Sequence, residues 1–116
     1  SPEFVVKVIN ELLDAANSEY GAAIANGKIA AAIEYQDSRG FVNYANQLLQ
    51  SVSSQMAKAY PEEHKAIATN IQQLSTAWPA AIPPAQPVKT PDQVTQLVKT
   101  IEQNSQKVLN RSNTPA

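Results

Sequence analysis

The chain has 116 residues, of which 43% are apolar and 16% charged, with no cysteine and a formal net charge of −1. This length suits one domain with one core, and the composition is that of a globular rather than a disordered protein. The charge gives no electrostatic reason to expect a nucleic acid or an anionic membrane as partner, and the lack of cysteine excludes disulfides and thiolate chemistry.

The first predicted helix covers about residues 4–26, where apolar residues recur at three- and four-residue spacing. Its expected core-facing stripe consists of Val5, Val8, Leu12, Ala16 and Ala23. Gly27 suits the position just after a helix, where chains often turn left-handed. Segment 25–28 therefore predicts a tight reversal, and no strand is expected.

The second predicted helix covers about residues 29–59 and is interrupted at Gly40, because glycine in a helix interior costs about 1 kcal/mol relative to alanine. Its expected inward stripe is formed by Phe41, Tyr44, Leu48 and Val52. Tyr60 and Pro61 end this helix and begin the next, since proline is well tolerated in the first helical turn.

The third predicted helix starts at Pro61 and ends near Pro79. The prolines of segment 79–91 then predict an extended, stiff connector. Thr90 as N-cap and Pro91 in the first turn predict the start of a fourth helix. Its apolar positions are Val94, Leu97, Val98, Ile101, Val108 and Leu109.

Four amphipathic helices joined by two short turns and one longer connector predict an all-α, antiparallel up-and-down four-helix bundle. We expect one domain over residues 5–111. Residues 1–4 resemble a cloning scar, and residues 112–116 are expected to be a flexible tail. No apolar run reaches the roughly 20 residues that span a bilayer. The chain is therefore expected to be an excised soluble module.

Three carboxylates fall on the predicted inward stripes: Glu19 on the first helix, and Glu34 and Asp37 on the second. At a rise of about 1.5 Å per residue, Glu19 and Glu34 lie about 10–12 Å from the reversal, so they are expected to face each other. Like charges at this spacing raise at least one pKa unless a positive group joins them.

A divalent or trivalent cation is the natural partner, because hard cations and iron accept carboxylate oxygens. Tyr20 and Tyr35 flank the acids and are expected to add phenol oxygens or hydrogen bonds. The alternative is that these acids are solvated at the open end of the bundle, or hydrogen-bonded internally.

Other residues offer less. His64 is expected to lie partly exposed at the far end of the bundle, where it forms at most a weak surface metal site with Glu63. Trp78 is expected to plug the core at the end that carries the acids. The sequence has no credible nucleophile and no phosphate-binding glycine loop, so no enzyme is expected.

The sequence from Glu19 to Ile29, followed by Glu34-Tyr35-Gln36-Asp37 and Phe41, resembles the N-terminal extracytoplasmic domain of bacterial Ftr-type high-affinity iron permeases. That family has an acidic residue before tyrosine, a short helix ending in Gly-Lys, then Glu-Tyr-x-acidic and a phenylalanine. Glu19 stands where the family usually has Asp, and Asp37 where it usually has Glu. The resemblance covers about residues 8–45.

The resemblance implies a periplasmic helical domain that precedes a membrane permease in the same chain and captures, delivers or senses iron or a related cation. Glu19, Glu34 and Asp37 would contact the metal, with support from Tyr20 and Tyr35. A homo-oligomer that completes the coordination shell stays open, and no nucleic acid is expected. The alternative function is a helical protein–protein interaction or sensor module without a metal site.

Overall fold

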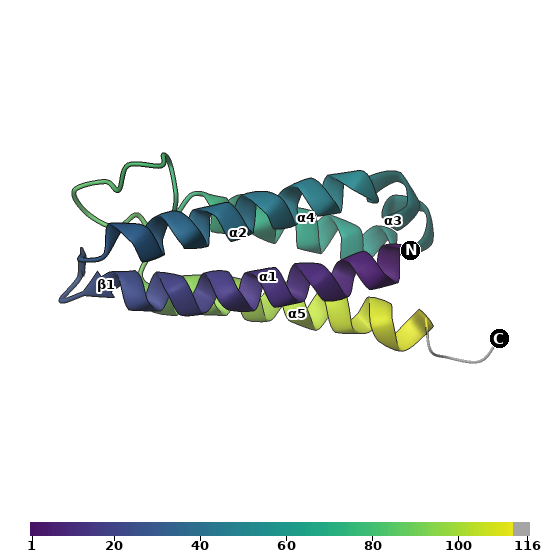
Figure 1. Cartoon of the computed structure of the whole chain (residues 1–116). Coiled ribbons are helices and arrows are strands. Elements are labelled where there is room, and N and C mark those ends of the chain that lie inside the picture. The colour runs from purple at the N-terminus through teal and green to yellow at the C-terminus, as the bar shows by residue number, and fades with distance from the viewer. Residues whose placement is uncertain (113–116) are drawn as a thin grey trace.

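A computed structural model describes residues 1–112 and shows long antiparallel helices joined at one end by a small hairpin (Figure 1). The helices are α1 (Pro2–Ala23), α2 (Ala32–Ser51), α3 (Ser53–Ala59), α4 (Pro61–Ser75) and α5 (Pro91–Ser112). The short strands are β1 (Ile24–Ala25) and β2 (Lys28–Ile29). The predicted four-helix bundle is confirmed, because the short α3 only continues α2 beyond a break.

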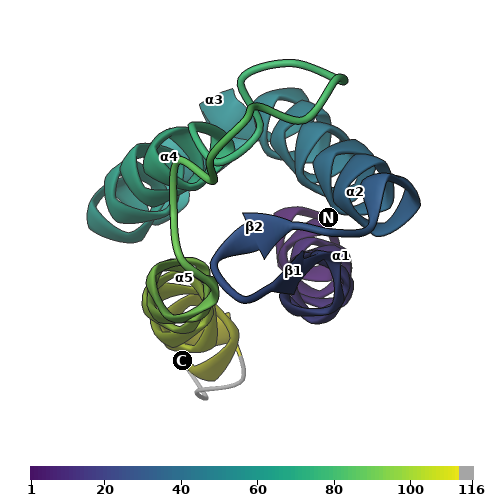
Figure 2. The same ribbon diagram turned by 90° about the vertical axis from the view of Figure 1, so that its left-hand side faces the viewer.

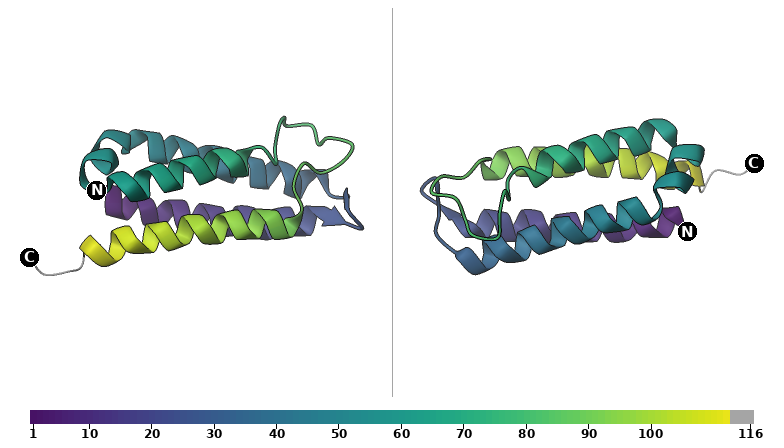
Figure 3. Two further views of the ribbon diagram at one scale, coloured as in Figure 1. Left: turned by 180° about the vertical axis from the view of Figure 1, so that it is seen from behind. Right: turned by 90° about the horizontal axis from the view of Figure 1, so that it is seen from above.

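The four long helices form a ring in which each has two neighbours (Figure 2). Helix α1 packs against α2 and α5, and α4 packs against α5 and α2. Residues 76–90, here called the end loop, connect α4 to α5 and lie at the same end as the hairpin (Figure 3). The start of α1 and the end of α5 lie at the opposite end. None of the helices in residues 1–112 is long and apolar enough to cross a membrane.

Buried residues recur along each helix at alternating spacings of three and four, as in bundles with coiled-coil-like packing. On α1 they are Val6, Ile9, Leu13, Ala16, Tyr20 and Ala23. On α2 they are Tyr35, Ser38, Val42, Ala45 and Leu49. Ala16 and Ala23 of the predicted α1 stripe are buried as expected. Val5, Val8 and Leu12 are only half-buried at its edge, because the residue after each of them fills the core. Tyr44, predicted to face inward, is 52% exposed.

The reversal between α1 and α2 is a β-hairpin rather than a simple helix end. Helix α1 stops at Ala23, three residues before the predicted end, and Ile24 pairs with Ile29. Asn26 and Gly27 have φ of 55° and 72°. Two successive left-handed residues are what a two-residue type I′ hairpin turn requires, and Asn-Gly is its preferred sequence. The expectation that no strand forms was wrong at this point.

Helix α2 runs through Gly40 without interruption, so the break predicted there was wrong. The chain leaves helical geometry at Val52 instead, where φ is −115° and ψ is 13°. Gly40 is exposed, and a Cβ added there would extend into open space. The modest cost of one glycine is outweighed by burial of the apolar face of α2, to which each large side chain contributes about 1.5–3 kcal/mol.

The predicted helix starts at Pro61 and Pro91 are confirmed. Thr90 Oγ1 accepts a hydrogen bond from the Gln93 backbone N–H (3.1 Å), and Gln93 Oε1 accepts one from the Thr90 N–H (2.9 Å). This is a capping box. Helix α4 ends at Ser75, before the predicted end near Pro79. Of the expected tail, Ser112 ends α5, and residues 113–116 lie outside the described residues.

Candidate functional site

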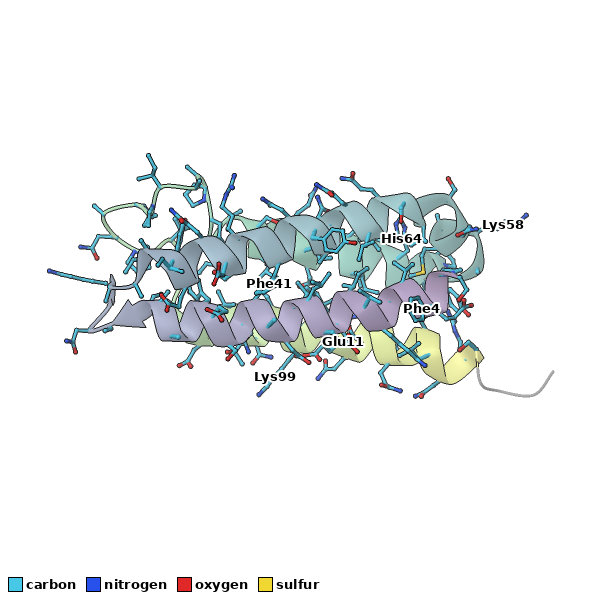
Figure 4. The ribbon with its side chains drawn as sticks, in the orientation of Figure 1. Phe4, Glu11, Phe41, Lys58, His64 and Lys99 are labelled. Carbon is cyan, nitrogen blue, oxygen red and sulfur yellow. The ribbon has the colours of Figure 1, made fainter. Side chains whose placement is uncertain are left out.

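The flank between α1 and α2 carries the first two predicted site residues. Asn17 on one edge of α1 bonds to α5, and Ser53 on one edge of the α2–α3 segment bonds to α4. The opposite edges of α1 and α2 therefore face each other. Phe41 lies there, between the two helices (Figure 4). This α1–α2 flank consists of Val5, Leu12 and Glu19 on α1, and of Glu34, Phe41 and Leu48 on α2, all half-buried.

Glu19 and Glu34 lie at nearly the same height on this flank. The backbone N–H of Ala31 donates to the Ala23 carbonyl at 3.2 Å, which aligns the end of α1 with the start of α2. Glu19 is four residues from Ala23 and Glu34 is three residues from Ala31, distances of about 6 Å and about 4.5 Å along the helices. The expectation that these two carboxylates meet across the helix pair therefore fits the register.

Asp37, the third predicted acid, is less buried than Glu19 and Glu34. It is exposed, because the buried residue of that turn is Ser38. Ser38 Oγ donates to the Tyr35 carbonyl (2.7 Å) and accepts from Trp78 Nε1 (2.8 Å). Among residues 1–112 there is no group of three His, Asp or Glu side chains arranged to hold a metal ion. The prediction of three inward-facing acids is thus corrected: Glu19 and Glu34 are half-buried at a similar height, and Asp37 is exposed.

The two predicted supporting tyrosines are fully buried and bind the end loop. Tyr20 Oη donates to the Lys89 carbonyl, and Tyr35 Oη lies 3.3 Å from the Ala77 carbonyl and 3.4 Å from that of Ala80. Burial, and to a lesser degree the charge of Tyr35, raise the pKa of Tyr20 to about 12. Burial also raises the pKa of Tyr35. Both rings are therefore neutral phenols at physiological pH.

Trp78 closes the core at this end, as predicted, and is 5% exposed. Its ring meets Tyr20 edge to face, with centroids 5.1 Å apart. Gln36 Nε2 donates to the Ala81 carbonyl at 3.4 Å, which adds another tie between α2 and the end loop. The expected stiff linker is thus anchored to the α1–α2 hairpin through its main-chain carbonyls.

The end of the bundle away from the hairpin holds a second polar group of residues. His64 is half-buried there and its Nε2 lies 3.2 Å from Ser53 Oγ (Figure 4). Glu63 is buried and pairs instead with Arg111 at 2.5 Å. The Arg111 guanidinium also lies 5.0 Å from the centroid of the Tyr60 ring. Glu63 therefore has a structural partner of its own, and His64 lies far from Glu34.

Sequence reasoning missed the contact between Asp14 on α1 and Glu102 on α5. Burial, a hydrogen bond with Asp14 and the charge of Asp14 raise the pKa of Glu102 to about 7. The sequence did contain a signal for this contact. Asp14 and Glu102 each directly follow a buried residue, on helices that pack against each other.

Comparison with protein families gives one match. A family model described as the iron permease-associated 4-helix bundle domain matches residues 1–112. No curated protein and no solved structure matches the chain. The matched span includes every helix of the bundle, and therefore extends well beyond the segment that carries the acidic residues.

Proposed function

Because the chain belongs to the family of iron permease-associated 4-helix bundle domains, we propose that it is the periplasmic domain of an iron-uptake permease and binds iron for delivery or sensing. The observation that carries the proposal is that Glu19 and Glu34 stand at nearly the same height on the α1–α2 flank, where both are half-buried. Every other position of this flank is apolar. Two half-buried carboxylates at the same level of a helix pair favour a cation between them.

Asp37 supplies the third carboxylate in this proposal. It lies three residues after Glu34 on the same helix, and residues at that spacing are neighbours on a helix surface. Its exposed side chain is free to turn toward an incoming metal ion. Tyr20 and Tyr35 act by positioning the end loop, since their hydroxyl groups already have carbonyl partners. The membrane-embedded part of the permease is the proposed recipient of the iron.

The test is metal titration by isothermal calorimetry, with ferric citrate and, under anaerobic conditions, ferrous ion. Wild type is compared with Glu19→Gln/Glu34→Gln, which keeps side-chain size while removing both charges. A matched control is Glu11→Gln/Glu62→Gln, which removes two exposed acids elsewhere. We expect the control to bind as wild type does and the site variant to bind at least about 10-fold more weakly, a loss of about 1.4 kcal/mol. Equal binding by all three proteins would refute the assignment.

One observation favours the alternative, a protein–protein interaction or sensor module. Ile33 in the first turn of α2 is 70% exposed, and Ile82 and Val88 in the end loop are 80% and 52% exposed. Large apolar side chains exposed together often mark an interaction site. Thermal stability separates the two functions. Acids held together for a metal destabilise the metal-free bundle, so Glu19→Gln/Glu34→Gln should melt higher; acids that serve structure should make it melt lower.

A further inference from the structure

The solvent-facing side of the α1–α2 pair consists of the positions that directly precede each buried residue. Asn17 and Ser53 each directly follow a buried residue, and they contact α5 and α4 instead. Since successive side chains are about 100° apart around a helix, the preceding positions lie on the other side, where α1 and α2 meet. These positions, here called the outer face, are the α1–α2 flank and its neighbours: Val5, Val8, Leu12, Ala15, Glu19 and Ala22 on α1, and Glu34, Asp37, Phe41, Tyr44, Leu48 and Ser51 on α2.

The outer face is largely apolar, whereas the positions that directly follow the buried residues on the same helices are not. Those following positions are Lys7, Asn10, Asp14, Asn17 and Gly21 on α1, and Gln36, Arg39, Asn43, Asn46 and Gln50 on α2. None of them is a large apolar residue. Both sets of positions border the same core, so the amphipathic character of the helices does not by itself explain why only the outer face is apolar.

The apolar side chains of the outer face are incompletely covered. Tyr44 is 52% exposed, and the other large apolar residues of the face are only half-buried. Figure 1 shows the α1–α2 pair with no other element of residues 1–112 in front of it, and Phe41 lies between the two helices (Figure 4). The outer-face positions alternate at spacings of three and four, as the core positions do. This is the spacing with which a helix packs against another helix.

The charged side chains of the outer face are all acidic, namely Glu19, Glu34 and Asp37 at its hairpin end. None of the nine Lys and Arg residues of the chain occupies an outer-face position. A second copy bound through the same face would place these acids against its own acids or against its apolar half, and both arrangements cost free energy. A partner that combines apolar side chains with positive charge is complementary to the whole face.

We propose that the outer face binds an amphipathic helix of a partner protein. The apolar side of that helix packs on Leu12, Phe41 and Tyr44, and its basic residues lie beside Glu19 and Glu34. At a rise of about 1.5 Å per residue, the distance from Val5 to Glu19 is about 21 Å, which matches a helix of about four turns. Helices with apolar anchors at this spacing are a recurrent form of peptide recognition. The apolar positions carry this inference, so it does not rest on the proposed function.

The experiment measures the binding of a capped, fluorescein-labelled peptide by fluorescence anisotropy. The peptide has about 21 residues, because shorter isolated helices are marginally stable, with Leu at the a and d positions of each heptad and Lys elsewhere. One control peptide has Glu in place of Lys, and another has the same composition with Leu placed outside the heptad spacing. A chelator in the buffer keeps the acids of the face free of metal. We expect the Leu/Lys heptad peptide to bind at least about 10-fold more tightly than either control.

Val8→Lys/Tyr44→Lys adds two positive charges to the outer face and should weaken binding of the heptad peptide at least about 10-fold. The matched control is Gln96→Lys/Gln103→Lys, which adds the same charge at two exposed positions of α5 and should bind as wild type does. If the first variant does not fold, Tyr44→Lys alone provides the decision, because Tyr44 is exposed.

Four outcomes would overturn the proposal. They are no binding of the heptad peptide, equal binding of a control peptide, unchanged binding by the Tyr44 variants, and equal loss of binding in the α5 control. Sedimentation of wild type as a dimer that Tyr44→Lys dissociates would assign the face to a second copy instead. Binding to phosphatidylcholine vesicles that Tyr44→Lys abolishes would assign it to a lipid surface.

Discussion

Glu102 is the residue that most directly links the stability of this bundle to pH. Its carboxyl group has an ordinary pKa of 4.5 and a pKa of about 7 in the folded chain, because of burial and of Asp14. Between these two values the folded chain retains a proton that the unfolded chain has lost. The stabilisation is therefore complete below about pH 4.5 and is lost as the pH rises through about 7.

We expect the free energy of unfolding to fall between about pH 5 and pH 8 in buffer that contains a chelator. Urea denaturation at each pH measures this slope. Glu102→Gln keeps a neutral hydrogen-bonding side chain, so its stability should be nearly flat over the same range and should exceed that of wild type at pH 8. Identical slopes for both proteins would show that another group titrates.

The sequence could not decide which residues of α1 face the core. Apolar residues come in adjacent pairs there, as with Val5 and Val6 or Leu12 and Leu13. Helical periodicity allows either member to face the core, so it left the stripe uncertain by one residue. The choice depends on packing with α2 and α5. That shift placed Tyr20 in the core and moved Glu19 to its edge.

Two glycines, Gly40 in α2 and Gly27 in the hairpin turn, test how the backbone conformation at one position affects the stability of the chain. Gly40 lies in the exposed middle of α2, and a Cβ there would meet nothing within 4 Å. Gly40→Ala should therefore stabilise the chain by about 0.5–1 kcal/mol. Gly27 has equally open space but a φ of +72°. Gly27→Ala should destabilise the chain by about 1 kcal/mol, because alanine is strained at that angle.

Chemical denaturation of both variants under one set of conditions measures this difference. The open space at both sites excludes steric clash as its cause, so opposite signs would isolate the effect of backbone conformation. A stabilising Gly27→Ala would contradict the hairpin turn. A destabilising Gly40→Ala would contradict an uninterrupted α2.

At the level of elements, the sequence was most informative where local chemistry decides. The Thr90 cap and the prolines at positions 61 and 91 predicted helix starts correctly, because they satisfy or remove free N–H groups within one turn. The break at Val52 could not be predicted, since no glycine or proline marks it. Beyond the break, α3 packs against α4.

The whole molecule is held together at the hairpin end by the end loop. Its carbonyls at Ala77, Ala80 and Lys89 are bound by the hydroxyl groups of Tyr35 and Tyr20. These contacts connect the α1–α2 pair to the α4–α5 pair. They also explain why the tyrosines predicted beside a metal site are buried instead: their aromatic rings fill the core while their hydroxyl groups reach the loop. No sequence spacing shows such a long-range contact.

Removing the hydroxyl groups should loosen the end loop and leave the helices intact. Tyr20→Phe and Tyr35→Phe each keep the ring in the core but leave a carbonyl without its donor, at a cost of about 0.5–1.5 kcal/mol. The double variant should lose about the sum of the two, provided that the two sites act independently. Hydrogen exchange of backbone amides between residues 79 and 90 should accelerate. Exchange in the middle of α1 and α4 should change only by the amount that the loss of global stability predicts.

Tyr44→Phe provides the matched control, because Tyr44 is 52% exposed and such surface changes usually alter stability by less than about 0.5 kcal/mol. If the end loop exchanges at the wild-type rate in the double variant, the tyrosine contacts do not hold it and the prolines alone must stiffen it. Faster exchange confined to the loop would instead show that the hairpin and the α4–α5 connection move as one unit through Tyr20 and Tyr35. Glu19 and Glu34 directly precede these tyrosines in the chain. An ion that moves the two acids would then also move the end loop through Tyr20 and Tyr35.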